Sequence, residues 1–571
     1  MSISPFNPGT SFLKKLLLVA VILLLLAGGT WFFLRRYLKS PDLSRQLNDR
    51  ITQLVQEKSG GRYRLSIGDI HLDPTQRSAT LRNIELVPDT SLLRSGQRIS
   101  LRLSNLLIKN VDITALLSQQ AVRLNTITVA GGEVLVESLG REKSDSAAAP
   151  AGVKEGREKL VRSVRKNLNS IGVDTLQLDG IDLVYLNRRK EKKTVRKIHI
   201  DLYDIAIDSA ALRDSTRLFF ARALRVSIDS LRLPVSDNRY LLSARKLIVS
   251  AGKQNLTHIS GLKLEAQPAQ SLEAAAAKAG VQKDIYRLTV KEITATEPGF
   301  TDLLEDSLIR AASVLISDAD LQVFNDKSNP PATVSKVGQY PHQLLKRLPF
   351  ALDIPVLAIE NGRVSYSEKN EKGDAIGKLL FTRVRGKIGP LSGKGNGLLP
   401  FKAEMDAHFM DASAVAVTFG FPVSRDGRFS VKANFAPFPV TQLNPMAIPL
   451  GNTKLVTGKV NRLYFTVNGN NDAAIATTTL QYEGLQIEVL GGSPEQGYRK
   501  KGLLSFIANN FVLQENNRPG DRYPDQRRAR YQRVTTKSFF NLVWKSVFYS
   551  VKSNTGVGKK GRDKERATLL P

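Results

Sequence analysis

Residues 357–366 read L-A-I-E-N-G-R-V-S-Y. Apolar and polar residues alternate on both sides of Asn361-Gly362, a dipeptide that two-residue β-turns favour because both of its residues tolerate φ > 0. The stretch therefore predicts a β-hairpin. Because alternate side chains on a strand share a face, the hairpin places four apolar side chains on one face, namely Leu357, Ile359, Val364 and Tyr366.

Three further stretches follow the same pattern and differ mainly in the expected turn. The apolar residues and turns are Ile127, Val129, Val134 and Val136 around Gly131-Gly132; Leu176, Leu178, Leu183 and Tyr185 around Gly180-Ile181; and Val314, Ile316, Leu321 and Val323 around Asp318-Ala319. Alternation arises by chance in any β-rich chain, but several copies in one register favour an internal repeat. The irregular spacing between copies argues against a solenoid with a strict short unit.

The composition indicates a long, basic chain that can bury a large core. The chain has 571 residues and a formal net charge of +30, which favours acidic partners such as anionic lipid, nucleic acid or acidic polysaccharide. Hydrophobic residues make up 42% of the chain, enough for a large core. Since there is no cysteine, disulfides, thiolate metal sites and cysteine nucleophiles are excluded.

The N-terminus predicts a retained membrane anchor. Residues 16–34 contain no charge and, as a helix, would span roughly 28 Å, about the thickness of a bilayer core. A cleaved signal peptide is the alternative, but its apolar region is shorter than this one. Trp31 lies near the end of the run, where interfacial aromatics are common. Basic residues flank both ends, so the charge does not set the orientation.

The rest of the chain divides into strand-rich segments, linkers and short helices. The predicted parts are a cytoplasmic leader at 1–15, a transmembrane anchor at 16–36, a helix with the first β segment at 37–140, a linker at 141–157, a middle β segment at 158–327, a linker with a short helix at 328–350, a C-terminal β domain at 351–515, a basic linker at 516–534, an amphipathic helix at 535–552 and a basic tail at 553–571. An Ala-rich helix is also expected from Ser271 to Gly280.

The amphipathic helix at 535–552 has two interpretations. Phe540, Trp544 and Phe548 widen its apolar side, and lysines accompany it, as in helices that lie on a membrane surface. The alternative is a helix that packs on the β domain or on a partner. The sequence leaves both open.

No catalytic or metal site is predicted. The five histidines are isolated and form no H-x-H or H-E-x-x-H pair, and there is no G-x-S-x-G elbow. The glycine-rich stretch at 393–397 resembles neither a phosphate loop nor a dinucleotide fingerprint. We therefore expect no enzyme, no cofactor and no metal. We also expect no nucleic-acid binding, because no recognisable binding motif accompanies the charge.

These features predict a mainly β fold: an N-terminal transmembrane helix followed by a long, twisted, mostly antiparallel sheet of repeated hairpins. An apolar face that curls without closing forms a groove that shields lipid tails, while charged rims hold the headgroups. The groove candidates are Val129, Val134, Val136, Leu178, Leu183, Tyr185, Ile316, Leu321, Ile359, Val364 and Tyr366. For the same residues, an ordinary sandwich core is the competing interpretation.

Several stretches resemble AsmA-like proteins of Gram-negative bacteria. They are the anchor and helix followed by G-G-R-Y-R-L-S-I-G-D-I at 60–70 and L-R-N-I-E-L at 81–86, the repeated apolar pattern, L-N-P at 443–445, T-G at 457–458, Y-E-G-L at 482–485, F-I-A-N-N at 506–510 and S-F-F-N-L-V-W-K-S-V-F at 538–548. The resemblance implies a single-pass inner-membrane protein with its body in the periplasm. It also implies a β-groove related to bridge-like lipid transfer proteins and a role in outer-membrane lipid homeostasis.

Three functions compete at this point. The first is a periplasmic groove that binds or passes phospholipid or another anionic envelope lipid. The second is an envelope scaffold that assists outer-membrane protein assembly and carries no lipid. The third, an envelope hydrolase, requires a carboxylate or histidine cluster in a cleft.

Overall fold

The computed structural model describes residues 43–570, except 74, 95, 113–120, 141–157, 159–160, 163, 166–168, 189–191, 215, 219, 237–238, 268–270, 372–374, 492–497, 502–513, 522–524 and 556–565. The predicted anchor, Trp31 and the 506–510 stretch lie outside these residues. Within the described part, no helix has the length and apolarity needed to cross a membrane.

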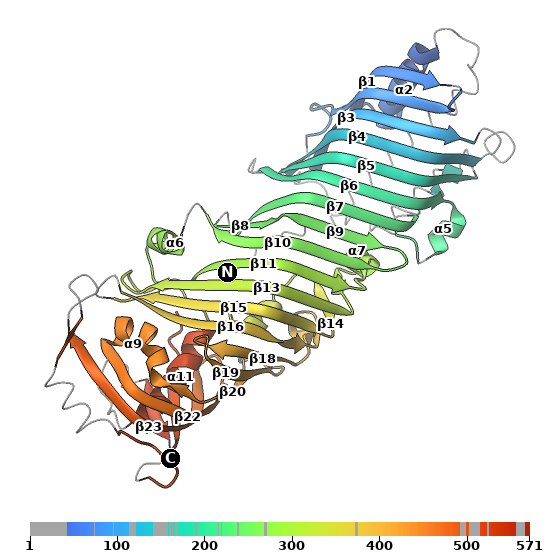
Figure 1. The fold of residues 1–571 in the computed structure, drawn as a ribbon. Coiled ribbons are helices and arrows are strands. Elements are labelled where there is room, and N and C mark those ends of the chain that lie inside the picture. Colours follow the sequence, from blue (N-terminus) through green and yellow to red (C-terminus); the bar gives the residue numbers. More distant parts are fainter. Residues whose placement is uncertain are drawn as a thin grey trace.

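One 23-stranded sheet dominates the molecule, as the predicted mainly β, mostly antiparallel fold requires. Figure 1 shows its strands stacked from β1 at one end to β23 near the other, in an elongated and twisted array. The strands of the first half are β1 (Tyr63–Asp73), β2 (Ser78–Pro88), β3 (Gly96–Val111), β4 (Ala121–Gly140), β5 (Ser170–Leu186), β6 (Lys192–Ile207), β7 (Ala221–Val235), β8 (Tyr240–Ala244), β9 (Lys246–Ala251), β10 (Leu256–Ala266) and β11 (Ile285–Thr296).

The second half of the sheet continues this order to the C-terminus. Its strands are β13 (Ser313–Asp326), β15 (Leu357–Lys369), β16 (Ile376–Gly389), β18 (Phe401–Phe409), β19 (Ser413–Phe421), β20 (Phe429–Phe435), β21 (Phe438–Pro439), β22 (Thr453–Gly469), β23 (Ala473–Gly491), β24 (Arg499–Lys500), β25 (Gln526–Gln532) and β26 (Ala567–Leu570). A separate small sheet contains β12 (Leu308–Arg310), β14 (Ala351–Ile354) and β17 (Leu391–Gly393).

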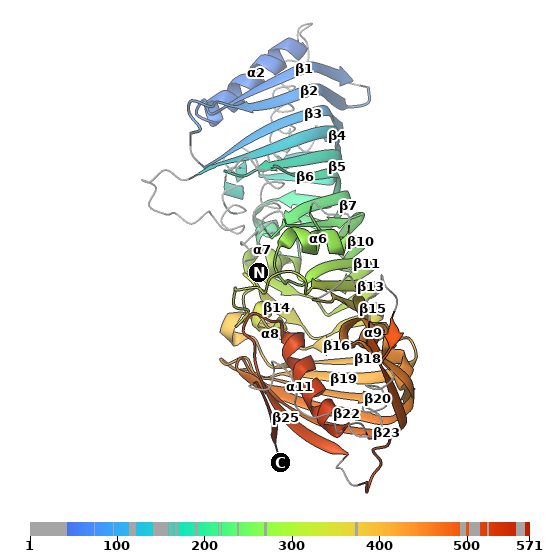
Figure 2. The same cartoon turned by 90° about the vertical axis from the view of Figure 1, so that its left-hand side faces the viewer.

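Short helices lie against the sheet. They are α2 (Leu43–Lys58), α5 (Ser209–Arg213), α6 (Leu272–Ala279), α7 (Phe300–Glu305), α8 (Pro341–Leu345), α9 (Asn444–Gly451) and α11 (Phe539–Asn554), with 3₁₀ turns at Gly395–Gly397 and Val440–Leu443. Helix α6 confirms the predicted Ala-rich helix: the Ser271 side chain caps its start, and Gly280 ends it in the left-handed conformation. Figure 2 shows the C-terminal strands curling around α11.

The four predicted hairpins are wrong: each stretch is one continuous strand. The copies at 127–136, 176–185, 314–323 and 357–366 lie within β4, β5, β13 and β15. A type I′ turn needs φ > 0 at both central residues. Here only the first residue is left-handed, with φ of +67° at Gly131, +67° at Gly180, +52° at Asp318 and +53° at Asn361. The chain therefore continues in its original direction.

The copies instead pair side by side. Strands β4 and β5 run parallel, with Val129 beside Leu178 and Val134 beside Leu183. Strands β13 and β15 also run parallel, with Ile316 beside Ile359 and Leu321 beside Val364. The internal repeat thus appears as two parallel pairs in matching register within an otherwise antiparallel sheet.

A line of left-handed residues creases the sheet across its strands. In most of the strands from β2 to β16, one residue near the middle has φ > 0: Asn83, Gly131, Gly180, Lys197, Gly261, Asp318, Asn361 and Arg383. The strand register keeps these residues close to one line; for example, Asn361 Nδ2 donates to Asp318 Oδ1 at 2.5 Å across the β13–β15 pair. Such a residue reverses the alternation of side chains, so that inward residues are three apart at the crease and two apart elsewhere.

The parallel pairs also explain where the crossovers lie. A parallel connection has to return the chain along a face of the sheet. The connection between β4 and β5 places Val161 and Val164 in the core of the N-terminal strands. The connection between β13 and β15 packs Leu345 and Phe350 in the C-terminal core, together with Val314 and Leu357 of the sheet. Both connections therefore cross the apolar face, which we call the inner face.

The C-terminal segments differ from the predicted boundaries. Strand β25 lies within 516–534, which was predicted as a basic linker, because its alternate residues Ala529 and Tyr531 are buried against the sheet and α11. Strand β26 likewise lies within the predicted tail and pairs with β25. Helix α11 falls two to four residues later than the expected 535–552.

Candidate functional site

The inner face carries unbroken apolar rows across the array. Cross-strand neighbours point to the same face, so the register identifies each row. The row beside the crease contains Ile67, Ile84, Leu103, Gly132, Ile181, Ile198, Ile228, Leu247, Ile259, Ile293, Ile316 and Ile359. With strands about 4.8 Å apart, this row extends for roughly 50 Å.

In the N-terminal third, the inner face is a filled core. Five of the predicted groove residues lie here, and each is at most 8% exposed: Val129, Val134, Val136, Leu178 and Leu183. Tyr185 packs against the same cluster. Ile51 of α2 is also a member of this cluster. For these residues the structure has the burial expected of an ordinary core.

The middle of the inner face is different, because its apolar side chains remain half-buried. We call this surface the middle face and define it by Leu242, Ile259, Leu264, Leu288, Ile293, Ile316, Leu321, Ile359, Val364 and Tyr366. None of them belongs to a core cluster of the described residues. Helix α6 packs on the opposite side of β11 and β13, through Ile285 and Phe324.

The remaining predicted groove residues lie in the middle face and make up half of the residues that define it. It placed Ile316, Leu321, Ile359, Val364 and Tyr366 on one face. It missed the contribution of β8, β10 and β11, including Ile259 and Ile293. Strands β8 and β11 lack a dipeptide like those that marked the repeat, whereas β10 has one in Gly261-Leu262 that was overlooked. The signal that could have found them is the spacing of apolar residues by three, then two, as in Ile259, Leu262 and Leu264.

The crossover from β13 to β15 borders the middle face and is held by α11. Buried Arg533, just before α11, lies 4.3 Å from the centre of the Tyr340 ring and donates from Nη2 to the Lys336 carbonyl at 2.7 Å. Tyr340 Oη donates to the Asn470 carbonyl at 2.8 Å. Burial raises the pKa of Tyr340 to about 12, so the hydroxyl keeps its proton near neutral pH.

A group of charged residues lies at the rim of the middle face, next to Tyr366. We call it the rim cluster and define it as Lys283, Asp284, Lys327, Lys336, Glu368 and Lys537. Lys336 Nζ is 3.3 Å from Asp284 Oδ2, and Lys327 Nζ is 3.3 Å from Glu368 Oε2. Tyr366 Oη donates to Glu368 Oε2 at 2.5 Å and so joins the apolar surface to the charged one.

Lysines outnumber carboxylates in the rim cluster, and the pKa values of two of these lysines are lowered. Burial is the largest cause that lowers the pKa of Lys283, followed by the positive charges of Arg239 and Lys336. Burial also lowers the pKa of Lys537, with Lys327 as the next cause. Within the described part of the chain, no carboxylate forms an ion pair with Lys283.

Helix α11 packs on the sheet and also exposes an aromatic stripe. Leu542 and Val547 are buried in the C-terminal core. Phe540, Trp544 and Phe548, the predicted membrane-interface residues, are 62%, 48% and 39% exposed. Their spacing of four residues places them on one side of the helix. The packing interpretation therefore describes one face of α11, and a membrane contact of the other face stays a prediction.

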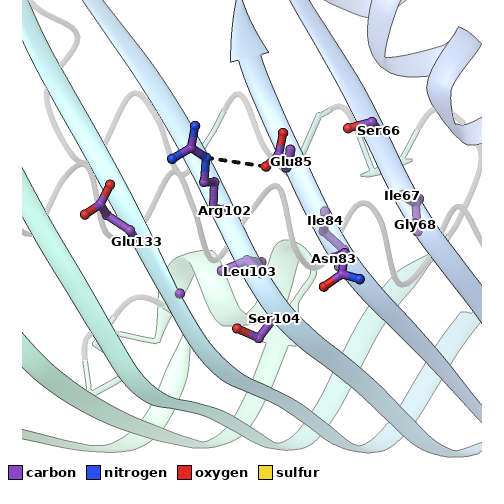
Figure 3. A pocket seen from close by; sticks show the side chains of 11 residues that line it. Ser66, Ile67, Gly68, Asn83, Ile84, Glu85, Arg102, Leu103, Ser104 and Glu133 are labelled. Carbon is purple, nitrogen blue, oxygen red and sulfur yellow. Dashed lines mark ion pairs between the residues drawn. The ribbon is translucent and has the colours of Figure 1, made fainter.

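Two polar sites lie on the outer face of the described strands. A depression of about 540 Å³ lies at the crease between β1 and β4, lined by polar groups such as Asn83, Glu85 and Ser104 (Figure 3). Further along the outer face, His199 Nδ1 lies 2.5 Å from Asp179 Oδ1 and Nε2 lies 3.6 Å from Asp229 Oδ2. All three side chains are at least 36% exposed, which is typical of polar contacts on a protein surface.

Among the described residues, no three His, Cys, Asp or Glu side chains are placed to hold a metal ion. Comparison with protein-family models and with curated proteins finds no match for this chain.

Proposed function

We propose that this chain is a membrane-anchored, AsmA-like protein whose sheet forms an open groove that binds or passes phospholipid in the periplasm. Most of the strands from β2 to β16 carry a left-handed residue at the crease, and in this proposal the crease bends the sheet into a groove. In this proposal the residues of the middle face contact acyl chains, and the anchor at 16–36 holds the groove at the inner membrane. The protein would thereby support outer-membrane lipid homeostasis.

The single observation that carries the proposal is the half-burial of a continuous apolar face. Apolar side chains of a soluble domain gain about 25 cal/mol for each Å² removed from water, so a wide uncovered sheet face is costly unless something covers it. The middle face crosses five strands in register, β8, β10, β11, β13 and β15, or roughly 19 Å. That length exceeds the depth of one leaflet of a bilayer core, which is roughly 15 Å.

The partial burial of the middle face favours lipid, rather than a second sheet, as the group that covers it. A sheet that packed on the middle face would bury its residues as fully as Leu178 and Val129 are buried in the N-terminal core. Acyl chains, by contrast, adapt to an irregular apolar surface and gain roughly 0.8 kcal/mol per buried CH₂. Tyr366 and the rim cluster supply the polar boundary that an amphiphile needs.

The test is the phospholipid content of the full chain, purified under native conditions from a Gram-negative host. The informative variants are Ile293→Asp and Ile316→Asp, which place a charge on the middle face. Leu315→Asp is the matched control, because Leu315 is also a half-buried apolar residue but points to the outer face beside Ile316. Lipid is measured by mass spectrometry, and folding is checked by circular dichroism.

We expect Ile293→Asp and Ile316→Asp to carry at least about one phospholipid fewer per chain than Leu315→Asp. Lipid bound around the anchor is the same in all three variants, so it does not affect the difference between them. Equal lipid content in folded inner-face and outer-face variants would contradict the proposal and favour a scaffold without lipid.

A further inference from the structure

We propose that the rim cluster binds the phosphate of an anionic lipid headgroup while the acyl chains lie on the middle face. This inference rests on the proposed function and deepens it. It assigns Lys283, Lys336 and Lys537 as the cations that face the phosphate, with Tyr366 at the border between headgroup and chains.

The first argument is the charge balance. The rim cluster holds four lysine ammonium groups, from Lys283, Lys327, Lys336 and Lys537, and two carboxylates, from Asp284 and Glu368, which leaves two positive charges in excess. Asp284 is further occupied by Asn325, whose Nδ2 donates to Oδ1 at 2.6 Å. A phosphate with one or two negative charges neutralises this excess.

The second argument is that these lysines come from separate segments that the fold holds together. Lys283 precedes β11, Lys336 belongs to the crossover between β13 and β15, and Lys537 precedes α11. The crossover and the α11 segment are joined by the Lys336 N–H, which donates to the Thr535 carbonyl at 2.7 Å. Lys537 Nζ in turn donates to Gln282 Oε1 at 2.6 Å, which ties α11 to the start of β11.

The third argument is the environment of the lysines. All four are half-buried, so water screens their mutual repulsion less than it would on an open surface. Burial is the largest cause of the lowered pKa values of Lys283 and Lys537, and nearby positive charges add to it. An anion in hydrogen-bonding distance would stabilise the charged forms, and charge-assisted contacts to phosphate are among the stronger polar interactions.

The fourth argument is position. Tyr366 lies on the middle face beside Val323 and donates to Glu368 of the rim cluster. An amphiphile whose chains follow the rows through Val323 and Leu321 therefore ends with its polar group at the lysines. Tyrosine suits such a border because its ring is apolar and its hydroxyl is polar.

The test compares two probes bound by the detergent-purified full chain. They are phosphatidylglycerol and diacylglycerol. Both probes have the same two acyl chains, and in each probe one acyl chain carries a photoactivatable group. The variant is Lys283→Gln/Lys537→Gln, and Lys283→Arg/Lys537→Arg is its charge-conserving counterpart. Lys263→Gln/Lys378→Gln is the matched control, because both of these lysines are exposed on the outer face.

We expect the Gln double variant to bind phosphatidylglycerol about tenfold more weakly, with diacylglycerol binding unchanged. The Arg variant should retain wild-type binding, and inorganic phosphate at equal concentration should not displace the lipid. If the double variant misfolds, Lys283→Gln alone serves, since Lys283 has no described ion pair to lose.

Each other outcome has a definite meaning. Equal loss in the outer-face control, or no loss in the Gln variant, would overturn the rim cluster as a headgroup site while leaving the groove intact. Displacement by inorganic phosphate alone would assign the cluster to free phosphate and overturn the lipid headgroup. Failure of the wild-type chain to crosslink either probe would overturn the proposed function itself.

Discussion

His342 is a buried base without a hydrogen-bond partner among the described residues. It is 1% exposed, and its ring stacks on Phe421 with the centroids 4.9 Å apart. Burial, with a smaller contribution from Lys346, lowers the pKa of His342 to about 4. The side chain therefore stays neutral in the folded protein at pH values where it would be protonated in an unfolded chain.

This difference makes stability depend on pH. The unfolded histidine takes up its proton near pH 6.5 and the folded one only near pH 4, so stability is full above pH 6.5 and falls as the pH drops towards 4. We expect a loss of about 2 kcal/mol between pH 7.5 and 5, measured by urea unfolding. His342→Phe should remove that loss, whereas exposed His71→Phe should retain it. An unchanged slope in His342→Phe would contradict the burial of a neutral ring.

Two glycines at the crease test why glycine is needed there: for a left-handed backbone conformation or for the lack of space for a side chain. Gly180 has φ of +67°, yet a Cβ there would meet nothing within 4 Å. Gly132 has no left-handed φ, but a Cβ would lie 2.5 Å from the Arg102 carbonyl oxygen. Gly180→Ala should cost about 1–2 kcal/mol of unfolding free energy, and Gly180→Asn should cost less because asparagine tolerates this conformation.

Gly132→Ala and Gly132→Asn should both destabilise the protein, by about 2 kcal/mol or more, because the neighbouring strand has to move. Denaturant unfolding measures all four variants. Relief of the Gly132 defect by asparagine would show that space is not the cause there.

At the level of single elements, α11 combines two surfaces with different expected costs. Leu542 is 1% exposed in the core, so Leu542→Ala should cost about 2–5 kcal/mol of stability. Trp544 is 48% exposed, so Trp544→Ala should cost less than about 1 kcal/mol. Thermal unfolding measures both.

If the exposed stripe contacts a membrane, Trp544→Ala should weaken vesicle binding without loss of stability. A large destabilisation by Trp544→Ala would instead mean that the stripe is covered in the folded protein.

The elements themselves were partly predictable from the sequence. Ser271 and Gly280 marked the ends of α6 because capping depends on local residues. Asn361-Gly362 predicted a turn and failed, because the same dipeptide suits a hairpin and a single left-handed residue within a strand. Which of the two forms depends on whether neighbouring strands continue on both sides, and that is a property of the sheet rather than of ten residues.

At the scale of the whole molecule, the sheet joins sequence-distant strands into one apolar surface. The mainly β character and the shared face of Ile316 and Ile359 followed from alternation, whereas Val364 shares that face because the crease reverses the alternation at Asn361. The parallel pairing of repeats, the crease and the half-burial of the middle face did not, since each depends on which strands become neighbours and what crosses over them. The rim cluster likewise assembles from segments more than 200 residues apart, Lys283 and Lys537.

The most direct measurement is site-specific photocrosslinking from the middle face in living cells. A photoreactive phenylalanine analogue replaces Ile293 or Ile316 in the full chain, and Leu315 carries it as the outer-face control. An open lipid groove predicts crosslinks to phospholipid, detected by mass spectrometry, from positions 293 and 316 and none above background from position 315. Crosslinks from 293 and 316 only to protein, or equal lipid labelling from all three positions, would contradict it.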